Sequence, residues 1–143
     1  MSKNKVLAEA IILSGYCDII LGILQKHKQL SINKTLVFSY LIKKNRFKEK
    51  EIYSANNSRD ILLKCISQLS GAFEDYCNSI EYVLKAIHLL IQSSHLLIDG
   101  DQLKYNSKNN DTIYIESNFI TKSISESNKM TERQFLKEVM HNV

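Results

Sequence analysis

Hydrophobic residues recur at steps of three and four along the first 27 residues, which is the spacing of one face of an α-helix. The pattern predicts a helix over residues 5–27. Glu9 and Asp18 interrupt the apolar run, which is shorter than the roughly 20 residues that a bilayer span needs. We therefore expect a soluble amphipathic helix. Its apolar, packed face is expected to consist of Val6, Leu7, Ala10, Ile11, Leu13, Cys17, Ile20, Leu21 and Leu24.

A second helix is predicted over about residues 33–44, after a polar break with the sequence HKQLSIN. Ser31 or Asn33 can cap it, because a side-chain oxygen there can accept a hydrogen bond from the first turn. The stretch KKNRFKEKEIYSANNS follows. It is highly charged and then rich in turn-forming residues, so it is predicted to be an exposed connection.

Two more helices are predicted before residue 94. One begins at residue 57 or 58, with Asp60 near its positive end, and runs to about residue 76. Asn78 and Glu81 have the spacing of a capping box, so another helix is expected over residues 79–93. It is the most apolar of the set, and we expect it to lie centrally.

A β-hairpin is predicted directly behind that helix. Residues 95–98 and 102–105 form two short runs around Asp99-Gly100-Asp101, and Gly100 can supply the positive φ of a tight turn. Two strands of four residues are not stable alone, so they must lie against the helices. The predicted fold class is mainly α: a winged-helix-like helical domain with a small β-hairpin wing and a C-terminal helical extension.

The last third of the chain is more polar. A linker begins at residue 106, DTIYIES at 111–117 is compatible with a third strand, and the following residues to 129 are polar again. A helix is predicted over 131–141, because Thr131 and Gln134 form a capping box. We therefore divide the chain into a winged-helix-like domain, residues 1–105, and an extension, residues 106–143.

Charge is distributed unevenly along the 143 residues. Residues 1–56 contain ten Lys or Arg and four Asp or Glu, a net +6, whereas residues 57–143 contain nine and eleven, a net −2. A phosphate backbone or an acidic protein surface could bind such an excess of positive charge. The candidate contact residues for DNA or an acidic partner are Lys43, Lys44, Arg46, Lys48 and Lys50. A solvated loop is the simpler interpretation of the same residues.

Cys17, Cys65 and Cys77 form no CxxC pair and are odd in number, which argues against a disulfide framework or a zinc site. All three are expected to be buried. His88 and His95 are seven residues apart, and no nucleophile motif surrounds any serine, so we expect no catalytic residues, metal or cofactor.

The helix before the hairpin would be the one that enters the major groove in a DNA-reading winged helix. Its sequence, SIEYVLKAIHLLIQSS, has Lys85 and few other donors, which disfavours sequence-specific reading of bases. The C-terminal helix is a second candidate contact. Its apolar side chains either fold back on the core or contact a protein partner, and they are Phe135, Leu136, Val139 and Met140.

Three segments together resemble a known family: an opening helix, an apolar helix with a basic loop and a serine-started helix, and a helix with a wing. They read VLAEAIILSGYCDIILGILQKH, LSINKTLVFSYLIKKNRFKEKEIYSANNSRDILLKCI and SIEYVLKAIHLLIQSSHLLIDGDQLKY. Over about residues 6–105 the chain resembles the middle component of bacterial three-component ABC-ATPase antiphage defence systems, a group that includes Lamassu-like systems. It lacks the proline in the basic loop and the Asn-Pro opening that are typical there.

The resemblance implies a non-catalytic, cytoplasmic adaptor subunit with no cofactor and no small-molecule substrate. Its partners would be an SMC- or Rad50-like ATPase and an effector nuclease subunit, with DNA sensed through the complex and no membrane involved. The alternative is a stand-alone winged-helix transcriptional regulator that binds DNA by itself.

Overall fold

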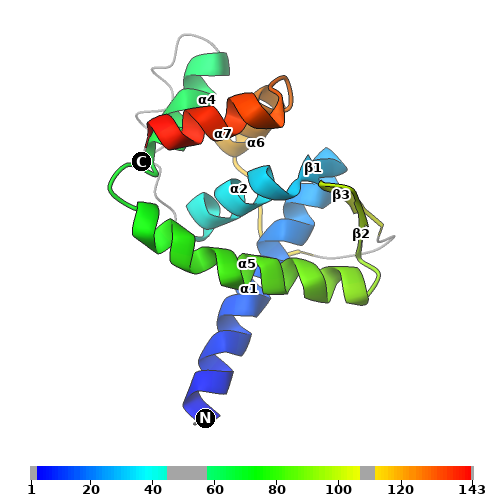
Figure 1. Ribbon diagram of the computed structural model, residues 1–143. Helices are drawn as coiled ribbons and strands as arrows, with labels where there is room; N and C mark the ends of the chain where they lie inside the picture. The colour runs from blue at the N-terminus through cyan, green and yellow to red at the C-terminus, as the bar shows by residue number, and fades with distance from the viewer. Residues whose placement is uncertain (1–2, 45–57, 107–111, 143) are drawn as a thin grey trace.

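The computed structural model describes residues 3–44, 58–106 and 112–142. Over these residues the chain is mainly helical, with a small three-stranded antiparallel sheet (Figure 1). The described elements are, in order, α1 (Lys3–His27), β1 (Gln29–Ser31), α2 (Ile32–Lys44), α4 (Ser58–Ser67), α5 (Phe73–Gln92), β2 (Leu96–Asp99), β3 (Gln102–Tyr105), α6 (Asn118–Ser127) and α7 (Glu132–His141).

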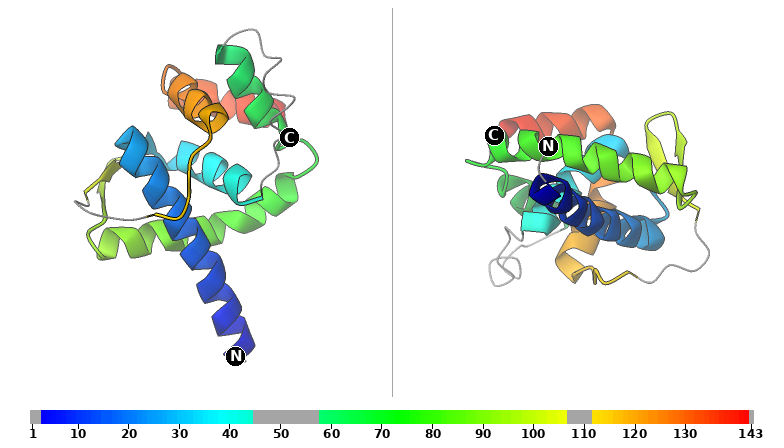
Figure 2. Two further views of the ribbon diagram at one scale, coloured as in Figure 1. Left: turned by 180° about the vertical axis from the view of Figure 1, so that it is seen from behind. Right: turned by 90° about the horizontal axis from the view of Figure 1, so that it is seen from below.

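α2 lies at the centre of the molecule, with α5 on one side of it and α6 and α7 on the other (Figures 1 and 2). Eight consecutive α2 residues, from Lys34 to Leu41, are buried, as expected of a helix with neighbours on all sides. Its predicted start is confirmed, since the Lys34 backbone N–H donates to Ser31 Oγ at 3.2 Å. The prediction that the helix before the hairpin lies centrally is wrong, because α5 covers one side of α2 and leaves Leu84 45% exposed.

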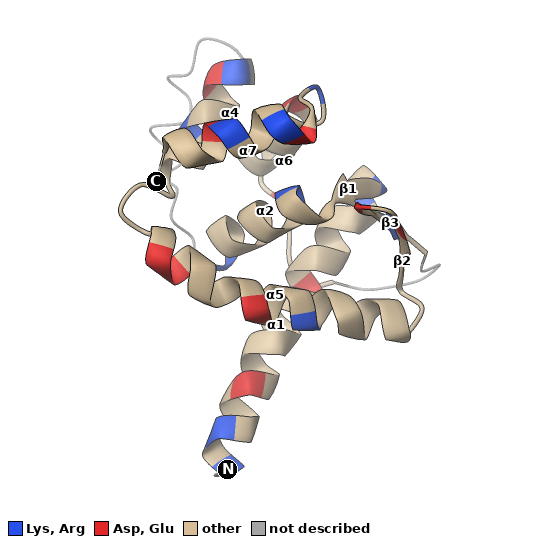
Figure 3. Ribbon diagram, in the orientation of Figure 1, with Lys and Arg blue, Asp and Glu red and all other residues tan. Residues whose placement is uncertain are grey.

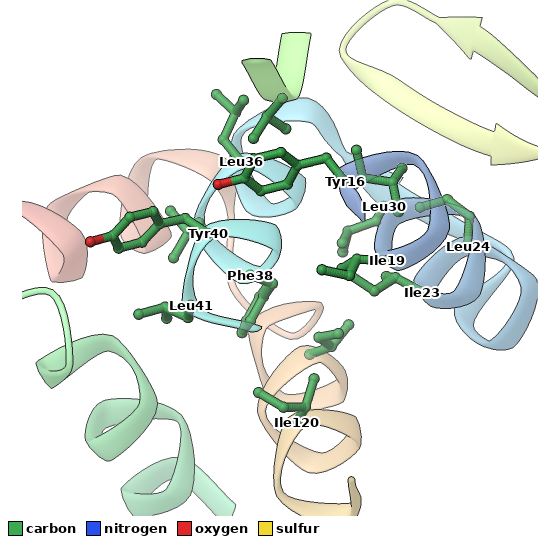
Figure 4. Close-up of a cluster of buried hydrophobic side chains, with 14 of the residues drawn as sticks. Tyr16, Ile19, Ile23, Leu24, Leu30, Leu36, Phe38, Tyr40, Leu41 and Ile120 are labelled. Atoms are coloured by element: carbon green, nitrogen blue, oxygen red, sulfur yellow. The ribbon is translucent and has the colours of Figure 1, made fainter. Parts of the chain in front are cut away.

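The hydrophobic core is one continuous cluster that includes residues from all six described helices and from the sheet. Figure 4 shows side chains of α1 and α2 together with Ile120 of α6 in this cluster. Phe119, Ile120 and Ile124 of α6 and Phe135 of α7 are buried in it. The residues after 105 therefore help to form the core of the residues before 105.

The predicted hairpin is confirmed as β2 and β3, with Gly100 at φ 61° in the turn. The sheet order is β1-β3-β2, so the sheet contains a strand that the sequence did not predict. Leu30 of β1 lies opposite Leu103 of β3, and both are buried. The predicted polar break after α1 is therefore a short edge strand, because burial of one leucine against the hairpin outweighs the polarity of its neighbours.

The predicted boundary between the third and fourth helices is wrong. α4 begins at Ser58 as expected but ends at Ser67, and α5 begins at Phe73 and continues through Asn78 without a break. Gly71 lies between them with φ 75°, a left-handed conformation that suits glycine and ends a helix. Asn78 and Glu81 are thus interior positions of α5, not a cap.

The extension differs from its prediction in two places. Residues 112–117 pair with no strand among the described residues. The polar stretch after them contains α6, which Ser117 caps by accepting a hydrogen bond from the Ile120 backbone N–H. The last helix is confirmed as α7, with both hydrogen bonds of the Thr131–Gln134 capping box present.

The cysteines are not all buried, as had been expected. Cys65 on α4 is buried, Cys17 on α1 is half-buried, and Cys77 on α5 is exposed. Cys77 is exposed because α5 already runs through this position and turns the preceding residue, Tyr76, toward the core. The prediction that Cys77 is buried is therefore wrong.

Candidate partner interface

Two residues of the predicted basic cluster fall within the described chain, and both contact other parts of the protein. The Lys43 side chain lies against Gly15 of α1, where a Cβ atom would stand 2.7 Å from Lys43 Nζ. Lys44 Nζ lies 3.6 Å from the Asp75 carboxylate at the start of α5. Both residues are exposed, and their side chains lie beside the neighbouring helices α1 and α5. Arg46, Lys48 and Lys50 lie outside the described residues.

The four apolar residues predicted on the C-terminal helix divide into two pairs. Phe135 and Val139 are buried in the core of this chain, at 0% and 4% exposure. Leu136 and Met140 are 40% and 63% exposed. These two are four positions apart on α7 and therefore adjacent on its outer face. Only this pair is accessible to a partner in the present structure.

α7 is fixed to α2 through a buried lysine. The Lys34 side chain is 7% exposed, and its Nζ lies 3.6 Å from Glu132 Oε1 and 3.4 Å from the Met130 carbonyl oxygen. The same ammonium lies 5.9 Å from the centre of the Phe135 ring, within the range of a cation–π interaction. An ammonium group that is this little exposed needs such partners to offset its loss of hydration, so α7 is an integral part of the folded domain.

The outward face of α5 is acidic and apolar. Its exposed residues include Glu74, Asp75 and Glu81, and α5 contains a single lysine, Lys85, and no arginine (Figure 3). Lys85 Nζ lies 2.6 Å from Glu9 of α1 and 3.2 Å from Glu81, and these hydrogen bonds raise the pKa of Lys85. The one cation on this helix is thus already paired with carboxylates.

An open apolar groove lies beside this ion-paired cluster, between α1 and α5. It has a volume of about 360 Å³ and is lined by Leu13, Leu84, Lys85, His88 and Leu89. Leu84 and Leu89 are each 45% exposed. We call the set of these five residues the α1–α5 groove.

The first half of α1 extends out of the body of the molecule (Figure 2). Its apolar residues were expected to be packed, but Val6, Leu7 and Ile11 are 52%, 61% and 70% exposed. Ile12 and Leu13 are partly buried against the core, and the buried residues of the helix begin at Tyr16. By length and composition α1 could cross a bilayer, but a core helix passes the same test, and residues from Tyr16 to Leu24 contribute to the core.

A buried carboxylate holds the segment before α6 against α1. The Glu116 side chain is 3% exposed, accepts a hydrogen bond from Thr121 Oγ1 at 2.6 Å, and lies 2.8 Å from His27 Nε2. The backbone N–H groups of Ile113 and Tyr114 donate to the Asp18 carboxylate at 2.8 Å. These contacts connect segments about 90 residues apart, so we assign them a structural role.

Gly22 has a clear reason to be a glycine. A Cβ atom at this position would lie 2.7 Å from the Tyr114 ring. The Tyr114 ring lies against Gly22 in the same way that the Lys43 side chain lies against Gly15.

A second hollow, of about 480 Å³, lies between the ends of α4, α6 and α7. Its charged lining is mixed, with Arg59, Lys129 and Lys137 near Glu126 and Glu138. Within residues 3–44, 58–106 and 112–142, no group of three or more His, Cys, Asp or Glu side chains could hold a metal ion.

Comparison of the chain with protein-family models, with curated proteins and with solved structures gives no match. The exposed pair on α7 was among the sequence candidates, whereas the α1–α5 groove and the exposed half of α1 were not. Apolar residues around the whole circumference of residues 6–13 were the available signal, since one helix face cannot pack them all.

Proposed function

We propose that this chain is a non-catalytic adaptor subunit of an SMC- or Rad50-like ABC-ATPase complex in bacterial antiphage defence, where it links DNA sensing to an effector nuclease subunit. Among the described residues, one helix and one strand are followed by three helices and the hairpin, and the sheet order is β1-β3-β2. This arrangement is compatible with a winged helix, the fold implied by the family resemblance. α5 would then be the helix that precedes the wing.

The observation that carries the proposal is the outward face of α5. A helix that reads bases in a major groove needs Arg, Lys, Asn or Gln directed at base edges. α5 directs Glu74, Asp75 and Glu81 outward, contains no arginine, and has a single lysine that is paired with two carboxylates. Its exposed amide side chains are limited to Asn78 and Gln92. A phosphate backbone would repel this face. The winged-helix unit is therefore better suited to proteins than to DNA, which favours the adaptor over the free-standing regulator.

The exposed face of α7 is the surface that we assign to a protein partner. Leu136 and Met140 lie beside the exposed cations Arg133 and Lys137 on the outer face of α7. An apolar pair with basic neighbours is complementary to an amphipathic partner helix with acidic flanks. Phe135 and Val139 support this face from within, because they hold α7 against α2.

The proposal predicts that a gene for an SMC- or Rad50-like ATPase lies beside the gene of this chain, and co-expression of the two proteins tests it. We expect the two proteins to purify together. The double variant Leu136→Glu, Met140→Glu should lose the ATPase, whereas Leu97→Glu on the wing, a site with 51% exposure, should retain it. If the Leu136→Glu, Met140→Glu variant still purifies with the ATPase, the outer face of α7 is not the surface that binds it.

A gel-shift measurement on the isolated chain separates the adaptor from the regulator. The adaptor is expected to bind DNA weakly and without sequence preference at physiological salt. Tight binding that discriminates between sequences, without co-purification of an ATPase, would replace the adaptor with the regulator.

A further inference from the structure

Ile113 and Ile115 are the most exposed large hydrophobic residues of the described chain, at 90% and 89%. Between them, Tyr114 packs its ring against Gly22 of α1. The two isoleucines instead point into solvent, and neither belongs to the hydrophobic core. An apolar pair that is directed outward in this way indicates a contact surface.

The outer side of α1 continues this surface. The Asp18 carboxylate accepts hydrogen bonds from the backbone N–H groups of Ile113 and Tyr114, so these residues lie on the side of α1 that Asp18 faces. At 100° per residue, Leu7 and Ile11 lie within about 20° of Asp18 around the helix axis. They are 61% and 70% exposed, and α5 packs on the opposite side of α1 (Figure 2). We call this set the outer apolar face, and it consists of Leu7, Ile11, Ile113 and Ile115.

Lysines flank the outer apolar face on both sides. Lys3 is exposed and lies about 60° from Asp18 in one direction around α1. Lys26 lies about 80° from Asp18 in the other direction, and its side chain is 47% exposed. The exposed Lys43 of α2 reaches the same flank, because its Nζ lies against Gly15. The apolar centre therefore has a basic rim.

The carboxylates on this side of α1 are held by donors within the protein. Asp18 accepts two backbone N–H groups at 2.8 Å. The Glu116 side chain is 3% exposed and lies 2.8 Å from His27 Nε2. The charge that this side presents to a partner is thus mainly that of the lysines. Exposed aliphatic side chains with lysines around them suit an anionic membrane surface, which offers hydrocarbon beneath a layer of phosphates.

A second copy of this chain suits the surface less well. Two outer apolar faces packed together would bring two basic rims close to each other, and like charges oppose such a contact. A membrane span is not required either. Residues from Tyr16 to Leu24 contribute to the core, so α1 cannot leave the domain to cross a bilayer.

We propose that the outer apolar face docks on an anionic phospholipid surface. α1 lies along the interface, the four aliphatic side chains enter the boundary between headgroups and acyl chains, and the lysines of the rim lie near phosphates. Docking leaves the core intact, because the side chains that enter the lipid are already exposed. The family resemblance implies no membrane partner, so this inference goes beyond the proposed function and does not rest on it.

Co-sedimentation of the full chain with vesicles tests the docking. The wild-type chain is expected to bind phosphatidylcholine vesicles that contain about 30% phosphatidylglycerol. It should lose most of this binding on phosphatidylcholine alone or at about 1 M salt. Ile11→Glu and Ile115→Glu should each weaken binding about tenfold or more. Leu84→Glu is the matched control, because this leucine is 45% exposed on α5, at the opposite side of α1.

The basic rim is tested in the same assay. Lys43→Gln should weaken binding to the anionic vesicles about fivefold, which corresponds to the contribution of one lysine near such a surface. Lys104→Gln removes a lysine of the wing whose side chain is 41% exposed, and it should leave binding unchanged. Equal effects of the two substitutions would mean that only net charge attracts the protein, and would overturn the oriented docking.

A single tryptophan reports which surface enters the lipid. The chain contains no tryptophan, so Ile115→Trp or Leu84→Trp supplies the only one. Emission from the Ile115→Trp chain should shift to shorter wavelength when anionic vesicles are added, and emission from the Leu84→Trp chain should not. A shift for Leu84→Trp alone would place the lipid at the α1–α5 groove and overturn the proposal.

A wild-type chain that does not bind anionic vesicles would overturn the docking, as would binding that Ile11→Glu and Ile115→Glu both retain. Self-association without lipid that Ile11→Glu abolishes, measured by sedimentation equilibrium, would assign the face to a second copy instead. Circular dichroism shows whether each variant remains folded. Co-purification of the ATPase is tested on α7, so loss of vesicle binding and loss of the ATPase are separate results.

Discussion

Phe135→Ala is the substitution that most directly tests whether α7 is part of the folded core. The ring is fully buried and its centre lies 5.9 Å from that of Phe38 on α2. The Lys34 ammonium lies 5.9 Å from the same ring. Truncation to alanine would remove a contact between α2 and α7 and leave a cavity between them.

The expected loss is about 3 kcal/mol in the free energy of unfolding. Phe→Ala substitutions in well-packed cores cost about 3–5 kcal/mol, from lost burial and the remaining cavity. Alanine recovers about 0.5 kcal/mol because it is a better helix former than phenylalanine. Since domains are stable by about 5–15 kcal/mol in total, a loss of this size is readily measured.

Urea denaturation followed by far-UV circular dichroism is the assay, because the sequence contains no tryptophan. Leu136→Ala is the matched control on the next residue of α7, which is 40% exposed, and we expect it to change stability by less than about 1 kcal/mol. Equal effects of Phe135→Ala and Leu136→Ala would refute the reasoning, because they would mean that α7 does not pack on α2 in solution.

Three further predictions concern cysteine reactivity, the buried carboxylate and alkaline pH. Burial raises the pKa of the Cys65 thiol to about 12. A thiol reagent should therefore modify exposed Cys77 at least about 100-fold faster than Cys65, and a fast Cys65 in a Cys77→Ser chain would contradict this. Glu116→Ala is expected to cost about 3 kcal/mol of stability in urea denaturation, because its buried donors lose their acceptor, and a loss below about 1 kcal/mol would argue against a role in the fold. Burial also raises the pKa of Tyr76 from 10.0 to about 12, so the unfolded chain releases this proton first and stability should fall as pH rises through that interval. Tyr76→Phe should reduce the slope of this part of the pH profile, with the remainder coming from Cys65 and Tyr114, whose pKa values burial also raises. An unchanged slope would contradict the role of Tyr76.

Features of the fold that depend on a few adjacent residues were predictable from the sequence. The Thr131–Gln134 capping box and the Gly100 turn are local, because the hydrogen bonds or φ angle that they require involve residues within one turn of the chain. The helix that precedes the hairpin was predicted as an element but was given the wrong start. Gly71 was the missed signal, since its left-handed conformation ends the preceding helical stretch.

Features that depend on distant partners were not predictable. β1 is a strand because Leu30 lies opposite Leu103, more than 70 residues later. α6 contains only three apolar residues, Phe119, Ile120 and Ile124, and has serines on its inner face, including buried Ser123 and Ser127, so the stretch is polar in overall composition. In both cases tertiary packing determines the structure and local propensity does not.

The candidate surfaces were partly predictable for the same reason. The sequence indicated an apolar face on the last helix but could not separate buried Phe135 from exposed Leu136, because both occupy the apolar sector of α7. The groove between α1 and α5 forms only where Leu13 and Leu84 come together, at positions 71 residues apart in the chain. A spatial pairing of this kind has no periodic signature in the sequence.

The central position of α2 has a consequence for the newly made chain. This helix is synthesised early, yet part of its surface is covered by α6 and α7, which follow roughly 80–100 residues later, an interval of about 4–20 s at ordinary elongation rates. Throughout that interval Phe38 lacks its aromatic neighbour Phe135 on α7, and its ring remains available for hydrophobic contacts with other proteins. Nascent chains stalled before α7 should therefore recruit chaperones, and release of the finished polypeptide should end that dependence.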